Sequence, residues 1–449
     1  MMKFSTYGAL AAGALALTAP TLGLAQETTL PPEASAHTVF IFNTLLFLMG
    51  GFLVFFMAAG FAMLEAGLVR SKNVAMQCTK NVVLFSLASV AYLIIGFNLM
   101  YPGDAWMMEG WIGAISLTSL EPVGASAEQI GDITYASVGS DFFFQLMFCA
   151  ATASIVSGAL AERIKLWPFL IFTVVLTGII YPVTASWKWG GGWLDAMGFQ
   201  DFAGSTVVHA CGGAAALAGA IILGARIGKF KDGQVHPLPG SSLPLATLGM
   251  FILWLGWFGF NGGSQLAMGT IGDVADVSRI FANTNTAAAA GAVMAAILTQ
   301  ILYSKVDLTM VLNGALAGLV SITAEPLAPE LWQAIVIGAI GGVVVVFTVP
   351  LLDSMRIDDV VGAIPVHFFA GIWGTIAVVW TNGDANIVTQ VVGIVAICGA
   401  TFAASLVFWG ILAATIGIRV SEEAEMAGLD AAEIGMEAYP EFGKGSQFV

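Results

Sequence analysis

Two histidines stand at matching positions in apolar segments of the sequence. His209 ends the run Asp201-Phe-Ala-Gly-Ser-Thr-Val-Val-His209, and His367 ends the run Asp359-Val-Val-Gly-Ala-Ile-Pro-Val-His367. An imidazole titrates near neutral pH and can donate or accept a hydrogen bond, so a buried pair could relay a proton or contact a small polar solute. One such histidine would be as readily a satisfied core residue, but two at repeat-equivalent positions indicate a pathway.

The spacing between aspartate and histidine predicts a shared depth. Eight helical residues rise about 12 Å, which reaches the midplane of a membrane core about 30 Å thick. If the two segments start on opposite membrane faces, as in inverted repeats, both imidazoles could meet there. Asp201 also stands where an N-cap residue would, so its carboxylate could accept from the next amides. Negative potential beneath an outer cation site is compatible with that capping role.

Aromatic and small polar residues gather at the predicted outer ends of the spans. These residues are Phe144, Phe148, Trp189, Trp257, Phe260 and Ser264. Aromatic residues near an interface are more often belt or packing residues, yet a tryptophan face attracts a desolvated cation by about 2 kcal/mol. A hydroxyl can accept a hydrogen bond from the same cation. No carboxylate or cysteine set accompanies the histidines beyond Cys211, so we expect neither a metal site nor a cofactor.

Composition requires that long helices in a bilayer position these residues. Hydrophobic residues make up 58% of the chain and charged residues 10%, too apolar for a water-soluble core. Runs of about 20 apolar residues predict membrane spans. We expect eleven spans, at about 39–68, 82–101, 141–161, 168–187, 203–225, 244–263, 279–303, 307–324, 332–351, 360–380 and 388–417. The expected fold is therefore an all-α polytopic membrane protein.

The N-terminal residues have the pattern of a signal peptide. Lys3 precedes an apolar stretch from Gly8 to Leu17, and a small-residue site ends at Ala25. The alternative, a twelfth membrane helix, is disfavoured because the stretch is short and Pro20 interrupts it. We expect three regions: a cleaved signal peptide at 1–25, a membrane domain at 26–418 and a cytoplasmic tail at 419–449.

Charge distribution sets the expected orientation in the inner membrane. Cleavage would leave the N-terminus outside, and eleven spans would leave the C-terminus inside. Basic residues on the expected inner side are Arg70, Lys72, Lys80, Arg163, Lys165, Arg226, Lys229, Lys231, Lys305, Arg356, Arg419 and Lys444. Cytoplasmic loops hold such an excess. The net charge of −14 lies largely in outer loops and the tail, which argues against nucleic acid as a partner.

Five stretches of the sequence resemble the Amt branch of the ammonium transporter superfamily, which also includes the Rh and MEP proteins. They are Gly158-Ala-Leu-Ala-Glu-Arg163, Trp189-Gly-Gly-Gly192, Asp201 to His209, Gly256-Trp-Phe-Gly-Phe-Asn261, and Asp358-Asp359 with His367. The resemblance in order and spacing extends over residues of about 38 to 441. The resemblance implies a homotrimer of eleven-helix protomers, each built from two five-helix inverted repeats plus a C-terminal helix.

The resemblance also implies roles for particular side chains. The outer recruitment site for ammonium would be formed by Trp189, Phe148, Ser264 and the nearby Asp201. The aromatic gate would be formed by Phe148 and Phe260, with Phe144 as a neighbour. The pore pair would be His209 and His367.

Two departures from the family pattern lie beside the histidines, and the tail carries a further resemblance. Ser205 replaces a usual glycine, and Phe368 follows the second histidine where glycine is usual, which puts local packing in question. The tail from Arg419 resembles the family's cytoplasmic regulatory tail, and PII signalling proteins are the partners that the family implies. A charge-rich tail alone is usually only solvated.

The expected function is transport of ammonium or ammonia, with methylammonium as a further substrate. An ammonium ion is unstable in a low-dielectric pore unless it is paired or deprotonated. We therefore predict recruitment outside, proton loss near the gate and passage of ammonia past the histidines. Two alternatives stay open: an ammonium sensor that conducts little, and an intramembrane enzyme with a histidine base. No nucleophile stands at a comparable depth, so we do not expect an enzyme.

Overall fold

The computed structural model describes residues 34–442. The expected signal peptide at 1–25 and the end of the tail at 443–449 lie outside the described residues. Strands within the described part form only two small antiparallel hairpins. These are β1 (Trp106–Met108) with β2 (Ile112–Gly113), and β3 (Phe230–Lys231) with β4 (Gln234–Val235). The rest of the regular structure is helical, as the apolar composition predicts.

The helices follow one another in two runs joined by the loop that carries β3 and β4. The first run is α1 (Ala36–Leu68), η1 (Ser71–Asn73), α2 (Val74–Ala91), η2 (Tyr92–Gly96), α3 (Phe97–Met100), α4 (Ala127–Ile130), α5 (Val138–Ala159), α6 (Leu166–Val175), η3 (Leu176–Ile180), α7 (Tyr181–Ser186), α8 (Trp193–Ala196), η4 (Ser205–Ala210) and α9 (Cys211–Leu223). The second run is α10 (Leu243–Gly263), α11 (Ile271–Tyr303), α12 (Leu308–Thr323), α13 (Leu331–Ser354), η5 (Ile364–Phe369) and α14 (Ala370–Thr381). After them come α15 (Ile387–Thr415), α16 (Glu422–Ala427) and α17 (Leu429–Glu433).

Ten helical segments among the described residues are long and apolar enough to cross a membrane. A shorter apolar helix, α12, coincides with the predicted span 307–324. The polytopic helical fold is therefore confirmed, and the total of eleven spans stays a prediction. The second span was predicted too short, because it runs from Ser71 to Met100 rather than over 82–101. Lys72 and Lys80 lower the hydropathy of its first turns, but the fold buries Lys80 completely.

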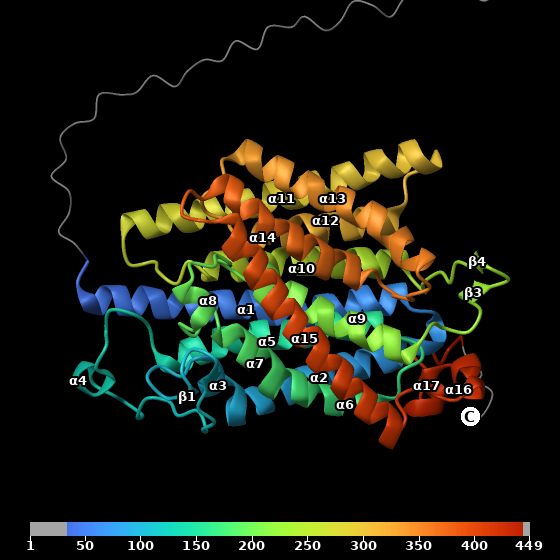
Figure 1. Cartoon of the computed structure of the whole chain (residues 1–449), viewed down its shortest axis with the longest axis horizontal. Coiled ribbons are helices and arrows are strands. Elements are labelled where there is room, and N and C mark those ends of the chain that lie inside the picture. Colours follow the sequence, from blue (N-terminus) through green and yellow to red (C-terminus); the bar gives the residue numbers. More distant parts are fainter. Residues whose placement is uncertain (1–33, 443–449) are drawn as a thin grey trace, which may run out of the picture. The chain divides into compact units, whose positions relative to one another are not determined.

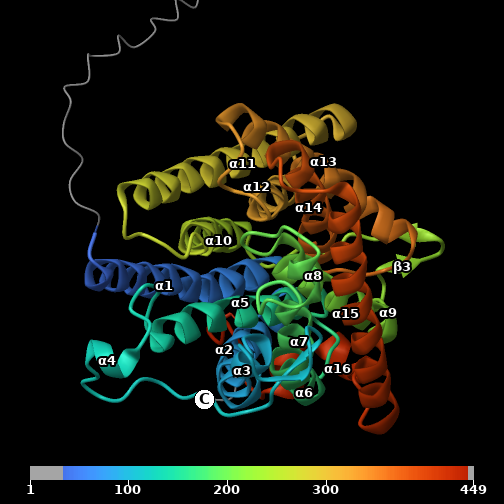
Figure 2. The same cartoon turned by 60° about the vertical axis from the view of Figure 1, so that its left-hand side comes forward.

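The two helical runs, which we call the first and second halves, pack against one another (Figures 1 and 2). The helices that begin them, α1 and α10, make the most extensive helix contact in the structure. The first-half element η4 packs against α14 of the second half, and η5 packs against α9 of the first. α15 lies obliquely across α9, α7 and α6. These contacts between the two halves place η4 and η5, the segments that carry the histidines, in the middle of the bundle.

Close approach of α13 to α11 depends on two glycines of α13. A Cβ at Gly338 would overlap the carbonyl oxygen of Ala287, and one at Gly342 would overlap that of Gly291. The backbone of α13 therefore lies directly against that of α11. Such contacts replace the hydrophobic driving force that helices lack inside a bilayer.

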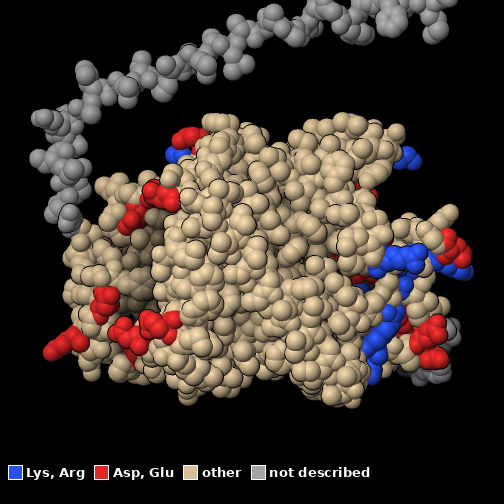
Figure 3. Space-filling model, viewed as in Figure 1, with Lys and Arg blue, Asp and Glu red and all other residues tan. Residues whose placement is uncertain are grey.

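Charged side chains occupy the two ends of the bundle and leave an apolar band between them (Figure 3). We call the end that carries α16 and α17 the tail face, and the opposite end the vestibule face. On the visible side, Lys and Arg gather at the tail face, while Asp and Glu predominate at the vestibule face. This distribution is the one that membrane spanning predicts.

Buried ion pairs join the helix ends at the tail face. Glu162 accepts from the Arg70 Nε at 2.6 Å, and Asp358 accepts from the Arg226 Nε at 2.8 Å. Arg163 donates to the carbonyl oxygen of Asp358 at 2.6 Å. Burial alone would raise the pKa of Asp358, but hydrogen bonds from Arg226 and the charges of Arg163 and Arg226 hold that pKa below its usual value. Two of the family-like stretches therefore hold this face together.

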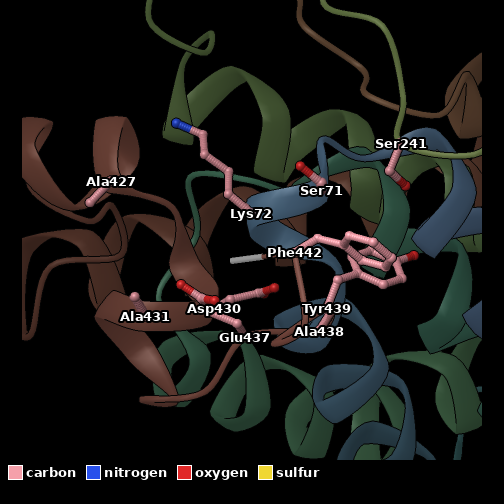
Figure 4. Close-up of a pocket in the computed structure, with 10 residues that line it drawn as sticks. All are labelled: Ser71, Lys72, Ser241, Ala427, Asp430, Ala431, Glu437, Ala438, Tyr439 and Phe442. Atoms are coloured by element: carbon pink, nitrogen blue, oxygen red, sulfur yellow. The ribbon is translucent and has the colours of Figure 1, made fainter. Parts of the chain in front are cut away.

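The tail is docked against the bundle rather than solvated. The Lys72 Nζ donates to the carbonyl oxygens of Glu425 and Met426 at 3.0 and 2.5 Å. The Asp430 carboxylate accepts from the amides of Ala75 and Met76 at 3.0 and 2.8 Å. A cavity of about 360 Å³ remains between the tail and the bundle. Figure 4 shows its lining, which includes the rings of Tyr439 and Phe442.

Candidate functional site

The two predicted pore histidines meet inside the bundle. The Nδ1 atoms of His209 and His367 are 3.2 Å apart, and the ring centroids are 5.2 Å apart with the planes 25° from parallel. The exposed fractions of these residues are 1% and 4%. One Nδ1 must donate and the other accept, so a proton is shared along this contact. The prediction that the imidazoles meet is confirmed.

Both histidines lie on π-helical turns, a feature that the sequence did not predict. His209 is the fifth residue of η4, and His367 is the fourth residue of η5. Such turns widen the helix by one residue and occur often at functional sites. A left-handed glycine precedes each turn, Gly204 with φ 104° and Gly362 with φ 77°. A side chain at either position would be strained.

The two equivalent aspartates cap these turns. The Asp201 carboxylate accepts from the amides of Gly204, Ser205, Thr206 and Val207 at 2.8 to 3.1 Å. In the second half, Asp359 accepts from the amides of Gly362 and Ile364 at 3.1 and 2.6 Å. The capping interpretation of Asp201 is therefore confirmed.

Aromatic rings surround His209 on its vestibule side. The Trp257 ring centroid is 4.9 Å from that of His209, and the Phe260 centroid is 5.1 Å away, both nearly parallel. The Trp257 Nε1 donates to the Thr323 Oγ1 at 2.8 Å, which fixes the indole. The Nε2 atom of His209 has no hydrogen-bond partner among the described residues. This atom is therefore available to hydrogen-bond a small solute.

The two predicted gate rings stack above His209. The centroids of Phe148 and Phe260 are 4.1 Å apart at an interplanar angle of 37°. Phe144 lies edge-on against Phe148 with centroids 4.8 Å apart, so it supports the gate as a neighbour. Each of these three residues is at most 1% exposed. Together the rings separate the histidines from the vestibule face.

A cavity of about 300 Å³ lies on the vestibule side of the gate, and we call it the vestibule cavity. Its lining residues are Tyr101, Tyr135, Asp141, Gln145, Phe148, Trp189, Phe202, Ser264 and Leu266. Three of the four predicted recruitment residues, Trp189, Phe148 and Ser264, are thus brought together. The Ser264 hydroxyl donates to the carbonyl oxygen of Phe260 at 2.8 Å. Its oxygen therefore keeps lone pairs with which to accept from a cation.

The fourth predicted recruitment residue, Asp201, does not line this cavity. Its carboxylate is occupied by the amides of η4, but its carbonyl oxygen accepts from the Trp189 Nε1 at 3.0 Å. The Phe148 and Trp189 rings are perpendicular, with centroids 5.9 Å apart. Asp201 therefore holds the indole in place through its backbone.

Asp141 is the acidic group of the vestibule cavity, and the sequence reasoning missed it. Its Oδ1 is buried without a hydrogen-bond partner among the described residues. Asp141 opens the predicted span 141–161, and it stands three and seven residues before Phe144 and Phe148. Those intervals place all three on one helix face. That spacing was the signal that could have identified the residue.

The two departures from the family pattern are accommodated without blocking the histidines. The Ser205 hydroxyl donates to the carbonyl oxygen of Val320 at 2.7 Å. Phe368 packs with Ala210, Ala214 and Ile394. Its backbone lies directly against Gly213, where a Cβ would overlap it. Phe368 is therefore directed into helix packing.

Comparisons with known proteins identify relatives over most of the chain. The Ammonium Transporter Family model matches residues 45–439. The chain is 42% identical over 426 residues to the ammonium transporter Amt2 of Archaeoglobus fulgidus, covering 88% of this chain and 87% of that protein. It is 39% identical over 413 residues to Amt2 of Haloferax mediterranei, covering 87% and 88%.

Solved structures show the same fold. A sensor Amt protein superposes with a TM-score of 0.80 at 33% identity, covering 88% of this chain and 98% of that one. Mep2 of Candida albicans superposes with a TM-score of 0.74 at 25% identity, covering 85% and 86%.

Proposed function

This chain belongs to the ammonium transporter family, and from that premise we propose a route for its substrate through the twin histidines. Its function is ammonium transport across a membrane, and its family is one of transporters rather than enzymes. The route begins in the vestibule cavity, passes the ring gate and continues along the histidine pair. The observation that carries the proposal is the direct contact between His209 and His367 beneath that gate.

Recruitment of ammonium in the vestibule cavity is the first step. The Trp189 ring offers a cation–π face, the Ser264 hydroxyl offers lone pairs, and Phe148 forms the floor. Asp141 adds a carboxylate whose Oδ1 is unpaired. Asp201 keeps Trp189 in place and adds negative charge below. A weak site of this kind holds a small cation without trapping it.

Deprotonation at the gate is the second step. Phe148 and Phe260 exclude water, and an ammonium ion there would lose its hydration without gaining a partner for each N–H. The His209 ring lies next to Phe260, and its Nε2 has no hydrogen-bond partner within the described part of the chain. It can accept the proton or hydrogen-bond ammonia, while the shared Nδ1 contact can pass a proton toward His367. Potassium cannot shed a proton, so it is rejected.

The orientation, the assembly and the regulation belong to the same proposal. We infer cleavage of the signal peptide after Ala25, insertion in the inner membrane with the tail face in the cytoplasm, and assembly as a homotrimer. The gathering of Lys and Arg at the tail face supports this orientation. The tail, residues 419–449, is the regulatory segment in this proposal, and a PII signalling protein is its proposed partner. Mass measurement of the mature chain and of the assembly in detergent tests these points.

Current measurement is the direct test of the route. Purified protein in liposomes should give a current after an ammonium step and a smaller one after methylammonium. Potassium should give none beyond that of protein-free liposomes. Ammonium binding without flux would instead indicate the sensor alternative, which the relatives do not favour.

A further inference from the structure

Besides Asp141, a second carboxylate has a buried oxygen without a hydrogen-bond partner among the described residues, and it lies on the tail side of the histidines. Glu65, in the last turn of α1, is 1% exposed. Its Oε2 accepts from the Gln77 Nε2, from the Asn81 Nδ2 at 3.0 Å and from the Ser157 Oγ at 2.7 Å. Its Oε1 has no partner among the described residues. A buried carboxylate oxygen without a hydrogen bond lowers the stability of the fold, which suggests that the Oε1 of Glu65 binds something that passes through the protein.

Glu65 shares a small cavity with His367, which we call the inner cavity. Its volume is about 10 Å³. Its lining residues are Phe61, Leu64, Glu65, Ser154, Ile155, Gly158, Asn313, Leu316, Val361, Ala363, Val366 and His367. That room suits one water or one ammonia. The cavity therefore places a single small molecule between the imidazole and the carboxylate.

Ser154 and Asn313, two other polar residues of the inner cavity, each donate to a backbone carbonyl. The Ser154 hydroxyl donates to the carbonyl oxygen of Ala150 at 3.1 Å, and the Asn313 Nδ2 donates to that of Val361 at 3.0 Å. Glu65 is the one carboxylate in this lining. The oxygens of Ser154 and Asn313 can accept a hydrogen bond but are too weakly basic to take up a proton, so the Glu65 Oε1 is the proton acceptor beside His367 in this lining.

A buried lysine stands behind the carboxylate. The Lys80 Nζ donates to the carbonyl oxygen of Ser157 at 2.8 Å and lies 4.9 Å from the centroid of the Phe169 ring. Ser157 thus contacts both charged groups, through its hydroxyl and through its carbonyl. The positive charge of Lys80 stabilises the ionised form of Glu65, and the Oε1, which has no hydrogen-bond partner among the described residues, can be protonated. Cys78 and His367 are the other titratable groups near Glu65.

We propose that Glu65 takes up the transported proton on the tail side of the histidines and returns it to ammonia. The ammonium bound in the vestibule cavity gives up a proton, which passes along His209 and His367 to the Glu65 Oε1 and forms the neutral acid. Ammonia in the inner cavity then takes that proton, because an amine is a stronger base than a carboxylate. Ammonium leaves and the carboxylate is restored. This inference rests on the proposed route.

The test measures the movement of charge and the movement of ammonia separately, in liposomes of phosphatidylethanolamine and phosphatidylglycerol. A current reports the proton, whereas alkalinisation of the lumen reports ammonia that crosses without one. In Glu65→Gln we expect the current to fall about tenfold or more, while protein-dependent alkalinisation persists. The amide keeps the size and the hydrogen-bonding capacity of the side chain but cannot carry a proton. Protein-free liposomes correct for leakage, and Glu128→Gln, an exposed carboxylate on α4, is the matched control.

An unchanged current in Glu65→Gln overturns the inference. So does an equal loss of current and alkalinisation in a folded assembly, which would make the cluster purely structural. If Glu65→Gln does not fold, Glu65→Asp decides, because it keeps the carboxylate and should retain current within about threefold of wild type. Loss of current in folded Glu65→Asp contradicts the proposal. A wild-type protein without current is a separate outcome, because it rejects the proposed route itself.

Discussion

The vestibule cavity and the inner cavity each present one carboxylate oxygen without a hydrogen-bond partner in the described part of the chain, but their volumes differ about thirtyfold, at about 300 and about 10 Å³. Asp141 faces a cavity lined by aromatic rings and hydroxyls, large enough for a hydrated cation. Glu65 lines a cavity that has room for one small molecule, and Ser157 links it to the buried Lys80. The wide cavity suits selection of ammonium, and the narrow one suits a single proton transfer. The same functional group thus serves binding on one side of the histidines and proton uptake on the other.

Removing the histidines should break the link between the two cavities, and we expect this effect to be the largest. His209→Ala with His367→Ala removes the shared Nδ1 contact and the His209 Nε2. Ammonium current should fall about a hundredfold, or the pore should become wet and lose its discrimination against potassium. Liposome currents with both cations measure the change. Size-exclusion chromatography of the same preparation must show an intact assembly.

Full current with full selectivity in the folded double variant would refute the role of both histidines. A loss of expression or stability alone would assign them to packing. The single variants sharpen the result, because only His209 touches the Trp257 and Phe260 rings.

Asp141→Asn should separate the functions of the two carboxylates. This change removes the charge of the vestibule cavity but keeps the size of the side chain. We expect the ammonium concentration for half-maximal current to rise about tenfold, equivalent to about 1.4 kcal/mol of binding free energy. The maximal current should stay close to wild type. Glu65→Gln should do the reverse, lowering the maximal current at an unchanged half-maximal concentration.

The same shift in both variants would mean that the cavities do not divide binding from proton transfer. Asp132→Asn is the control for Asp141→Asn, because Asp132 is an exposed aspartate in the loop before α5. It should leave the half-maximal concentration unchanged.

The contact between the two histidines was predictable, whereas the unpaired oxygens of Asp141 and Glu65 were not. Aspartate and histidine eight residues apart, repeated in two segments, predicted the cap at Asp201 and the contact between the two imidazoles. An unpaired oxygen depends on which donors the fold brings from other helices, as α2 and α5 do for Glu65. Sequence spacing could place Asp141 on the helix face of Phe144 and Phe148, but it could not show which carboxylate oxygen lacks a donor. The π-helical turns were missed for the same reason, since they depend on packing between the halves.

The predicted recruitment residues should contribute less than the charge of Asp141. Trp189→Leu removes the cation–π face, and Ser264→Ala removes the hydroxyl acceptor. Each change should raise the half-maximal ammonium concentration by about fivefold, within the range of an exposed cation–π contact. Potassium should remain a poor substrate in both, because the gate and the histidines are unchanged. Unaltered concentration dependence in the double variant would reject this site.

Truncation after Arg419 should have the smallest effect, and it should act on the inner cavity alone. The Glu425 Oε1 accepts from the amide of Ile227 at 2.6 Å, next to Arg226, which binds Asp358. Asp358 begins the segment that reaches Val361, a lining residue of the inner cavity. The vestibule cavity has no tail residue in its lining.

Loss of the tail should therefore loosen the segment at Asp358 without changing recruitment. We expect about a twofold change in maximal current, less than about 1 kcal/mol, because the lost contacts of Glu425 and Asp430 lie at the tail face, away from the gate and the histidine pair. The half-maximal ammonium concentration should stay the same, and thermal unfolding should show an intact membrane domain. Glu425→Gln is the finer variant, since it weakens the bonds to Ile227 and Arg419 while the rest of the tail stays docked. A changed half-maximal concentration in either variant would mean that the tail also controls the vestibule cavity.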